Sequence, residues 1–231
     1  MLSTGTVVGL NAVELSNHGQ FWWNWWVNIA VAVGTFCAVL VALFGDWIKS
    51  LWFRPKLALK LRNPKGERTK VMLFWTEADG KQGSREAVGR YYHVQVSSLN
   101  RWPPATNVQV FLTRIEEPGP DGELQIKWSG DIPIRWRNQE IFPPTRTIGP
   151  ATDCDLCGVV ENKWLDIYPL VKPNNLESQR RGAVIMVVSL QARSNEADSR
   201  IHRFKISWDG KWEDGDAEMS QHLVLKDITQ G

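Results

Sequence analysis

The chain has 231 residues, of which 43% are hydrophobic and 23% are charged, and its formal net charge is +2. This composition excludes an intrinsically disordered chain, which would lack the apolar residues needed for a core. About 175 residues remain once the short N-terminus and the apolar segment that follows it are removed, enough for one well-packed domain. Sparse use of cysteine, with three residues in all, suits a reducing compartment.

An apolar segment at residues 22–48 predicts one membrane-spanning helix. The stretch from Trp25 to Phe44 carries no charge, and at about 1.5 Å of rise per residue it matches the roughly 30 Å hydrocarbon core of a bilayer. Indole rings favour headgroup depth because they join an apolar body to one N–H donor. The predicted aromatic anchors at the two ends are Trp22, Trp23, Trp25, Trp26, Trp47 and Trp52. A cleaved signal peptide is the alternative, but the segment lacks a basic n-region and a convincing cleavage site.

Small side chains recur at every fourth position of this predicted helix and therefore share one face. They are Ala30, Gly34, Ala38 and Ala42. Such a face lets two helix backbones approach closely, which predicts a homo-oligomer formed through the helix. The alternative interpretation is that Ala and Gly are common in membrane helices whatever their contacts.

Charge is distributed unevenly about the predicted span. Residues 1–45 hold one acidic residue and no Lys or Arg, residues 46–70 hold eight basic and two acidic residues, and residues 71–231 hold 19 basic and 22 acidic residues. Positive charge beside one end of a span retains that end in the cytoplasm. We therefore expect an inner-membrane protein with a short extracytoplasmic N-terminus at residues 1–21 and a cytoplasmic C-terminal domain.

A basic interfacial linker is expected at residues 49–56, between the span and the domain. Its groups expected to meet anionic lipid headgroups are Lys49, Arg54 and Lys56.

Beyond the linker, residues 57–231 alternate between apolar and polar side chains with a period of two, which predicts half-buried strands. Strands are predicted at residues 56–62, 70–76, 90–99, 106–115, 124–128, 132–136, 183–192, 201–208 and 223–228. Residues 77–89 are expected to form a loop, residues 138–182 to be the least regular part, and no amphipathic helix is predicted. The expected fold is mainly β, an antiparallel immunoglobulin-like β-sandwich of about eight strands with residues 183–192 near its centre.

Two of these predicted strands resemble a known signature. The run from His93 to Asn100 (HVQVSSLN) and the run from Ala105 to Val110 (ATNVQV) resemble the strand–loop–strand pattern of bacterial immunoglobulin-like domains, in which a strand ends near an Asn and a small residue opens the next. The whole layout is similar to bacterial single-pass membrane proteins with a β-rich cytoplasmic domain. Both resemblances imply a fold and no activity.

The main candidate for chemistry is the C-x-x-C motif formed by Cys154 and Cys157, because thiols at this spacing can hold a metal or exchange disulfides. A structural zinc needs four ligands, and His93, His202 and His222 would have to converge on the pair from distant strands. The glycines and proline around the motif do not fit the strand–helix junction of a redox site. We expect two ordinary thiols in a loop, with metal binding as the alternative.

Other patterns associated with ligands or catalysis are incomplete. Residues 209–216 (DGKWEDGD) fail as a calcium loop because Lys211 occupies the third position, and there is no G-x-S-x-G, Walker or G-x-G-x-x-G motif. Basic residues gather loosely in the middle third of the chain, near two tryptophans. They are Arg135, Arg137, Arg146, Lys172, Arg180 and Arg181. A nucleotide or nucleic-acid surface is one interpretation. The net charge of −3 over residues 71–231 opposes general nucleic-acid binding, which favours a solvated face with cation–π contacts.

These patterns predict a binding protein without a catalytic site or cofactor. We expect a membrane-tethered cytoplasmic binding or scaffold module whose partners are the lipid bilayer and another protein. The alternative is an oligomerising membrane effector, in which the β-domain senses a ligand and the transmembrane helices assemble.

Overall fold

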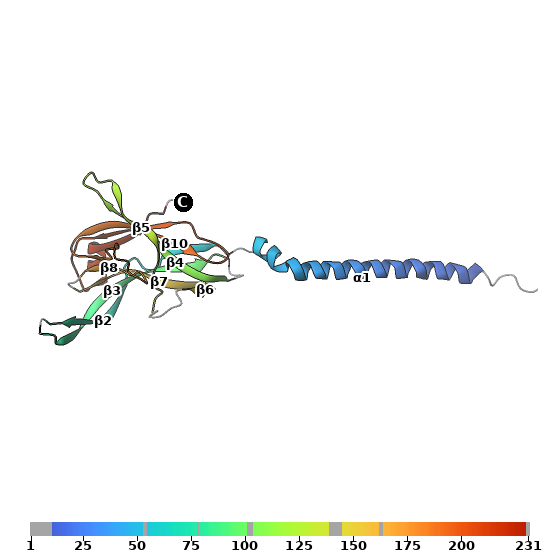
Figure 1. The fold of residues 1–231 in the computed structure, drawn as a ribbon, viewed down its shortest axis with the longest axis horizontal. Helices are drawn as coiled ribbons and strands as arrows, with labels where there is room; N and C mark the ends of the chain where they lie inside the picture. The colour runs from blue at the N-terminus through green and yellow to red at the C-terminus, as the bar shows by residue number, and fades with distance from the viewer. Residues whose placement is uncertain are drawn as a thin grey trace, which may run out of the picture. The chain divides into compact units, whose positions relative to one another are not determined.

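The computed structural model describes the backbone of residues 11–52, 55–77, 79–100, 104–138, 145–161 and 164–229, and within the first helix it describes the side chains of residues 22–45. The chain forms two units, which divide between Trp52 and Phe53. The first unit is a single helix and the second is a domain of two β-sheets (Figure 1).

Helix α1 spans Asn11–Trp52, so it extends past both ends of the expected residues 22–48. Its uncharged stretch Trp22–Gly45 has 24 residues, none of them buried, and is long and apolar enough to cross a membrane. At about 1.5 Å per residue this stretch is about 36 Å long, which exceeds the hydrocarbon thickness of a bilayer. The Thr35 hydroxyl donates to the Val31 carbonyl at 2.8 Å, so this polar side chain is satisfied within the helix itself.

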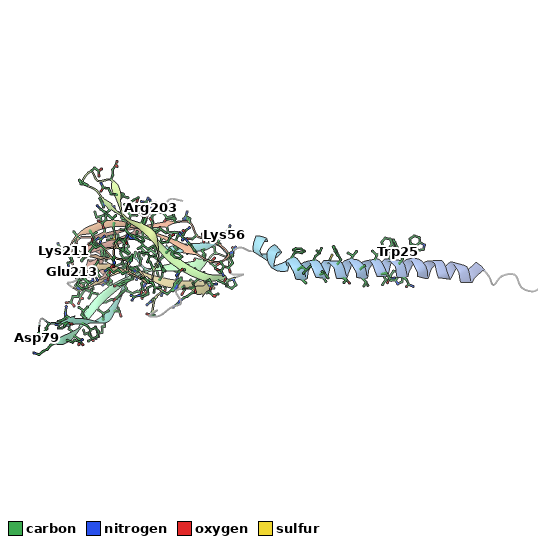
Figure 2. The ribbon with its side chains drawn as sticks, in the orientation of Figure 1. Trp25, Lys56, Asp79, Arg203, Lys211 and Glu213 are labelled. Atoms are coloured by element: carbon green, nitrogen blue, oxygen red, sulfur yellow. The ribbon has the colours of Figure 1, made fainter. Side chains whose placement is uncertain are left out.

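The tryptophans at the start of the uncharged stretch form an exposed cluster. The rings of Trp22 and Trp25 lie 5.9 Å apart and those of Trp25 and Trp26 lie 5.1 Å apart, both edge to face. The side chains of Trp47, Lys49 and Trp52, and all of Arg54, lie outside the described residues. Lys56 is exposed where the chain enters the β-domain (Figure 2).

The β-domain confirms the expected antiparallel sandwich, with two six-stranded sheets. The first sheet contains β1 (Leu57–Leu61), β2 (Glu67–Thr76), β3 (Gln82–Ser98), β7 (Ala151–Val160), β8 (Leu165–Ile167) and β9 (Gln179–Arg180). The second contains β4 (Ala105–Pro118), β5 (Leu124–Pro133), β6 (Arg146–Ile148), β10 (Val184–Arg193), β11 (His202–Trp208) and β12 (Leu223–Asp227). These twelve strands exceed the expected eight mainly because β6, β8 and β9 are only two or three residues long.

Strand order explains which segments are buried most deeply. The first sheet runs β1-β3-β7-β8-β9, with β2 also paired to β3, and the second runs β12-β11-β10-β4-β5, with β6 paired to β4. β10 therefore lies at the centre of its sheet, as the apolar run at residues 183–192 predicted. β1 and β2 lie one after the other along the same edge of β3, because β1 pairs with residues 94–98 and β2 with residues 82–91.

The core lies between the two sheets and takes one face of each. β3 contributes Tyr92, Val94 and Val96, and β4 contributes Val110 and Leu112, all of them buried. The alternation predicted for these strands is thereby confirmed. The tryptophans buried in this core are Trp128, Trp136 and Trp208.

Three expectations about local structure are wrong. Residues 82–89 were expected in a loop, but they belong to β3 because β2 pairs with all eight of them. Residues 151–160 were expected to be irregular, but they form β7, which pairs with β3 and β8 in the middle of the first sheet. Residues 216–222 form a short helix, α2 (Asp216–His222), where none was expected.

Candidate functional site

A hairpin projects from the first sheet. β2 pairs with β3 from Glu67, opposite Tyr91, to Thr76, opposite Gln82. β7, which lies on the other edge of β3, begins its pairing only at Gly89. Residues 70–88, here called the arm, therefore continue beyond the sheet as two strands alone, and Figure 1 shows β2 and the start of β3 projecting from the sandwich.

The arm exposes large apolar side chains. Phe74 is 78% exposed, Met72 is 52% exposed and Trp75 is 42% exposed. Phe74 and Met72 share one face of β2, because side chains alternate along a strand. An isolated two-stranded hairpin is marginally stable in water, and an exposed apolar edge strand invites pairing with another chain. The arm is thus the part of the described domain that most resembles an uncovered contact surface.

One contact stabilises the arm internally. The Trp75 ring lies across the opposite strand at Gly83, where a Cβ atom would collide with the indole. An aromatic ring over a cross-strand glycine shields the backbone at that position and strengthens the pairing. A salt bridge of 2.7 Å between Lys70 and Glu86 joins the same two strands on the other face.

The arm lies far along β3 from the point where the chain enters the domain. Leu57, the first residue of β1, is opposite Ser98, whereas Phe74 is opposite Ser84. Fourteen residues of strand separate Ser84 from Ser98, which corresponds to about 46 Å. Lys56 and Asp79, at the tip of the hairpin, accordingly lie at opposite ends of the domain (Figure 2).

A buried arginine fastens the base of the arm. Arg90 is fully buried, and its Nη1 donates to the Lys65 carbonyl at 3.0 Å and to Asp216 Oδ1 at 2.6 Å. Its Nη2 donates to the Asp214 carbonyl at 3.2 Å. These bonds join β3 to the β1–β2 turn, to the segment that precedes α2 and to the first residue of α2. The guanidinium beside Asp216 holds the pKa of that carboxyl below its usual value.

The β1–β2 turn fits closely over this arginine. Gly66 has φ +73°, a left-handed conformation that glycine adopts without strain. A Cβ atom at this position would lie 2.8 Å from Cγ of Arg90 and 2.9 Å from the ring of Tyr92. The turn that leads into β2 is therefore set by backbone geometry as well as by the ionic contact.

Charged residues crowd the outer face of the first sheet beside the arm's base. We call them the basal ion cluster, which consists of Arg62, Glu67, His93, Arg135, Arg137, Asp153 and Asp155. Strand register gathers them, because His93 is opposite Asp155 and Gln95 is opposite Asp153. The segment after β5 runs along β7 at these positions, with the Arg137 N–H donating to the Asp153 carbonyl at 3.0 Å.

Each acid of the basal ion cluster contacts at least one base. Arg137 binds both carboxylate oxygens of Glu67, and Arg62 lies between Glu67 and Asp153 and pairs with both. These contacts tie the first residue of β2 to the turn that follows β1 and to β7. The cluster is therefore a fixed foundation for the hairpin, since several mutually satisfied charges hold a geometry better than one exposed pair.

A second set of contacts continues from His93. Its Nδ1 lies 2.9 Å from Asp155 Oδ1, and Arg135 Nε donates to Asp155 Oδ2 at 3.3 Å. The Arg135 guanidinium lies 4.9 Å from the centre of the Tyr168 ring, which in turn stacks on Tyr91 at 5.6 Å. Burial raises the pKa of Tyr168 above its ordinary value.

A cavity of about 440 Å³ opens between the arm's base and this set, lined by residues including Thr69, Tyr91, His93 and Asn138. A histidine oriented by a carboxylate is one part of a catalytic triad, but a triad also needs a nucleophile bonded to the other ring nitrogen. In the described part of the chain, the contact of His93 Nε2 is with Glu67, at 3.8 Å, rather than with a hydroxyl or thiol. His93 thus lies between Asp155 and Glu67.

Cys154 and Cys157 lie in strand β7 and not in a loop, which corrects the expectation for their surroundings. Both are fully buried. A register shift opposite Tyr92 and His93 lets two residues three apart both face the core. Burial raises the pKa of both thiols, with the charge of Asp155 adding to the rise at Cys154 and that of Asp166 at Cys157. Cys154 Sγ donates to the Val94 carbonyl at 3.3 Å.

Two of the histidines considered as further zinc ligands, His202 and His222, form other contacts. His202 stacks on Phe204 in β11, and His222 Nδ1 lies 2.7 Å from Asp209 at the end of α2. No group of three or more His, Cys, Asp or Glu side chains placed to hold a metal ion occurs among the described residues.

The remaining predicted sites resolve into local contacts. Residues 209–215 connect β11 to α2 without regular secondary structure, with bends at Gly210, Asp214 and Gly215. Of the six basic residues in the middle third, Arg146 lies 5.7 Å from the Trp136 ring and Arg181 lies 6.0 Å from the Trp164 ring. The expected cation–π contacts are confirmed. Sequence reasoning missed the basal ion cluster because its members come from five separate segments.

Comparison of the chain with protein-family models, with curated proteins and with solved structures finds no match in any of the three.

Acid pH should separate the ionic fastening of the arm from the core. Asp216→Asn removes the carboxylate that Arg90 holds. Because the pKa of Asp216 is lowered in the folded protein, the pair stabilises the fold above the ordinary Asp pKa of about 3.9 and loses this effect as pH falls through the lowered value. We expect the variant to unfold at a lower temperature than wild type between pH 5 and 7, and the two midpoints to converge below about pH 3.9. Far-UV circular dichroism measures both midpoints.

Glu123→Gln, an exposed carboxylate in the β4–β5 turn, is the matched control for this experiment. It should leave the midpoint unchanged throughout the pH range. A constant difference between wild type and Asp216→Asn down to pH 2.5 would show that the aspartate acts through packing and not through its charge.

The buried thiols should be unreactive in the folded protein. In a Cys37→Ser background, we expect Cys154 and Cys157 to react with iodoacetamide at least about a hundredfold more slowly than after unfolding in urea, because burial and a raised pKa suppress the thiolate. Mass spectrometry of time points gives both rates. Stoichiometric zinc in purified protein that disappears with Cys154→Ser and Cys157→Ser would contradict the description of two ordinary thiols.

Proposed function

We propose that this protein is a membrane-tethered binding module. In this proposal α1 crosses the inner membrane, and the β-sandwich in the cytoplasm engages another protein through the arm. The observation that carries the proposal is the exposure of Phe74, Met72 and Trp75 on a hairpin whose base is rigidly held. Aromatic residues and methionine are enriched in protein interfaces.

The orientation rests on charge. The eight basic residues between positions 46 and 70 flank the C-terminal end of the span, and no Lys or Arg precedes it. Such asymmetry retains the basic side in the cytoplasm. The exposed Lys56 at the entry to the domain would then lie within reach of anionic headgroups.

The proposal is of a binding protein and not of an enzyme. The basal ion cluster supports this choice, because its acids and bases neutralise one another and leave His93 without a bonded nucleophile in the described part of the chain. A charged network of this kind positions a recognition element, and loops and strand edges on a rigid sandwich are common recognition surfaces.

Paired substitutions on two hairpins test the role of the arm. Met72→Ser with Phe74→Ser removes apolar surface from the arm, whereas Leu124→Ser with Ile126→Ser removes exposed apolar surface of the same kind from the β4–β5 hairpin. We expect the arm variant to lose at least about nine-tenths of the chains bound to the full-length protein after gentle extraction from membranes, because buried aromatic contacts dominate interface energies. Native mass measurement, with identification of each bound chain, gives the result.

The control pair should retain its bound chains, and both double variants should keep the wild-type unfolding midpoint. Retention of the same bound chains at the same yield by the arm variant would refute the arm as the contact element.

A second candidate function is an oligomerising membrane effector, favoured by the exposed row of Ala30, Gly34, Ala38 and Ala42 on α1. Gly34→Leu with Ala38→Leu should abolish an oligomer that depends on close helix packing, because two leucines hold the backbones apart. Phe36→Leu, on the opposite side of the helix, is the control. An oligomer of unchanged mass in the first variant would exclude this row as the interface.

A further inference from the structure

A cavity of about 400 Å³ lies on the outer face of the second sheet, lined mainly by residues of β4, β10 and β11. Strand register places Ser189 of β10 directly opposite Arg114 of β4 on one side and Arg203 of β11 on the other. Ser189 faces outward, since Val188 and Leu190 on either side of it belong to the core. Because serine is short, this row of three residues is hollow in its middle, and about 9.5 Å separates the two arginine Cα atoms. We call the row the serine notch.

Ser189 forms the floor of the serine notch, and its hydroxyl is free to bind a ligand. The residue is only 4% exposed, yet the hydroxyl forms no hydrogen bond with any other described residue. The Thr113 hydroxyl donates to the Ser189 carbonyl at 3.1 Å and leaves the serine hydroxyl unused. Buried hydroxyl groups in folded proteins are normally hydrogen-bonded. A free one on the floor of a cavity therefore points to a group that binds there.

The two arginines of the notch keep N–H donors for a further acceptor. Arg203 donates to Glu116 Oε2 through Nη2, at 2.7 Å, and no hydrogen bond within the described residues uses its Nε or Nη1. Arg114 Nη1 lies 3.9 Å from Glu116 Oε1, which is beyond hydrogen-bond distance. The buried Glu116 thus holds both guanidinium groups beside the notch without saturating either. Guanidinium groups with free donors match the oxygens of phosphate and carboxylate groups.

Charge around the notch is strongly positive. On the same face, Lys205 of β11 and Lys226 of β12 are exposed and lie directly opposite each other. Neither forms an ion pair with another described residue, and like charges in this arrangement destabilise a sheet. With Arg114 and Arg203 they make four positive charges against the one negative charge of Glu116, a net of +3, although the chain beyond residue 70 carries −3. A bound anion would relieve this local excess.

We propose that the serine notch binds a phosphate ester. Arg114 and Arg203 donate to the phosphate oxygens from opposite sides, the Ser189 hydroxyl donates from the floor, and the two lysines attract the anion. A phosphate dianion suits the notch better than a carboxylate, because its three free oxygens accept from several directions and its charge offsets more of the excess. Soluble metabolites and lipid headgroups both carry this group. The notch lies outside the arm, so this inference goes beyond the function proposed above.

Thermal unfolding of the full-length protein in nanodiscs, followed by tryptophan fluorescence, measures binding of two matched probes. Glycerol 3-phosphate is the soluble probe, added to protein in phosphatidylcholine nanodiscs. Phosphatidic acid, which is the diacyl ester of glycerol 3-phosphate, is the lipid probe, included in the nanodiscs at about 20%. We expect one of the probes to raise the unfolding midpoint by about 3 °C, which for about 10 mM soluble probe corresponds to a Kd of about 1 mM. Sodium chloride at the same ionic strength should give no such rise.

Arg114→Gln and Ser189→Val each remove one donor from the notch. Arg114→Gln leaves the bond between Arg203 and Glu116 in place, so without a probe it should unfold at the wild-type temperature. In each variant we expect the rise to fall to about 1 °C or less, because affinity at least about tenfold weaker removes most of the stabilisation by ligand. Arg85→Gln, which removes an exposed arginine from the arm, is the matched control and should keep the full rise.

A rise with glycerol 3-phosphate that Arg114→Gln removes would assign the notch to a soluble phosphate ester. A rise confined to phosphatidic acid, and removed by the same variant, would assign it to a lipid headgroup. No rise with either probe, or an equal rise in wild type and Arg114→Gln, would overturn the inference. The proposed function is tested separately by the chains that Met72→Ser with Phe74→Ser releases, so either idea can fail without the other.

Discussion

Strand β3 extends beyond its pairing with β7, and this difference in length determines how the hairpin projects from the first sheet. Its residues 89–97 pair with β7, but its first seven residues have only β2 as a neighbour. Because β2 is hydrogen-bonded to β3, it also extends beyond the sheet, and its apolar run lies outside the core. Where the hairpin leaves the sheet, Arg90 and Glu67 are each bound to more than one segment, and these bonds hold the hairpin's base. An exposed hairpin on a well-ordered base is the outcome.

Much of the fold follows from alternation in the sequence. The runs around Val94, Val110 and Phe204 have a period of two, and each has its predicted face in the core. Alternation of apolar and polar residues did not predict two of the strand segments, for different reasons. The start of β3 has no apolar alternation because neither of its faces is covered, and β7 interrupts its alternation with a bulge that turns Cys154 and Cys157 to the same side. In both segments, backbone hydrogen bonding to a neighbouring strand determines the structure, and the side-chain pattern does not show this pairing.

The candidate site was less accessible to such reasoning. The apolar run Val71–Trp75 has the composition of a core strand. It is exposed because β7 pairs with β3 only from Gly89 onward and does not reach the arm. The basal ion cluster joins residues up to 91 positions apart, so no local spacing in the sequence predicts it. The apolar stretch of α1, by contrast, was predictable from local sequence. Its length and lack of charge are properties of consecutive residues, which is why the apolar stretch Trp22–Gly45 was predictable.

The fastening of Arg90 also has a consequence for biosynthesis. Asp216 lies 126 residues further along the chain, and at 5–20 residues per second translation needs about 6–25 s to cover that interval. During this time α1 and the β2–β3 hairpin have already been made, while Asp214 and Asp216, which bind Arg90 at the hairpin's base, are still to come. The nascent hairpin therefore acquires its final support late, when most of the sandwich is available to fold around it. The hairpin is therefore synthesised early, and two of the residues that hold its base are synthesised late.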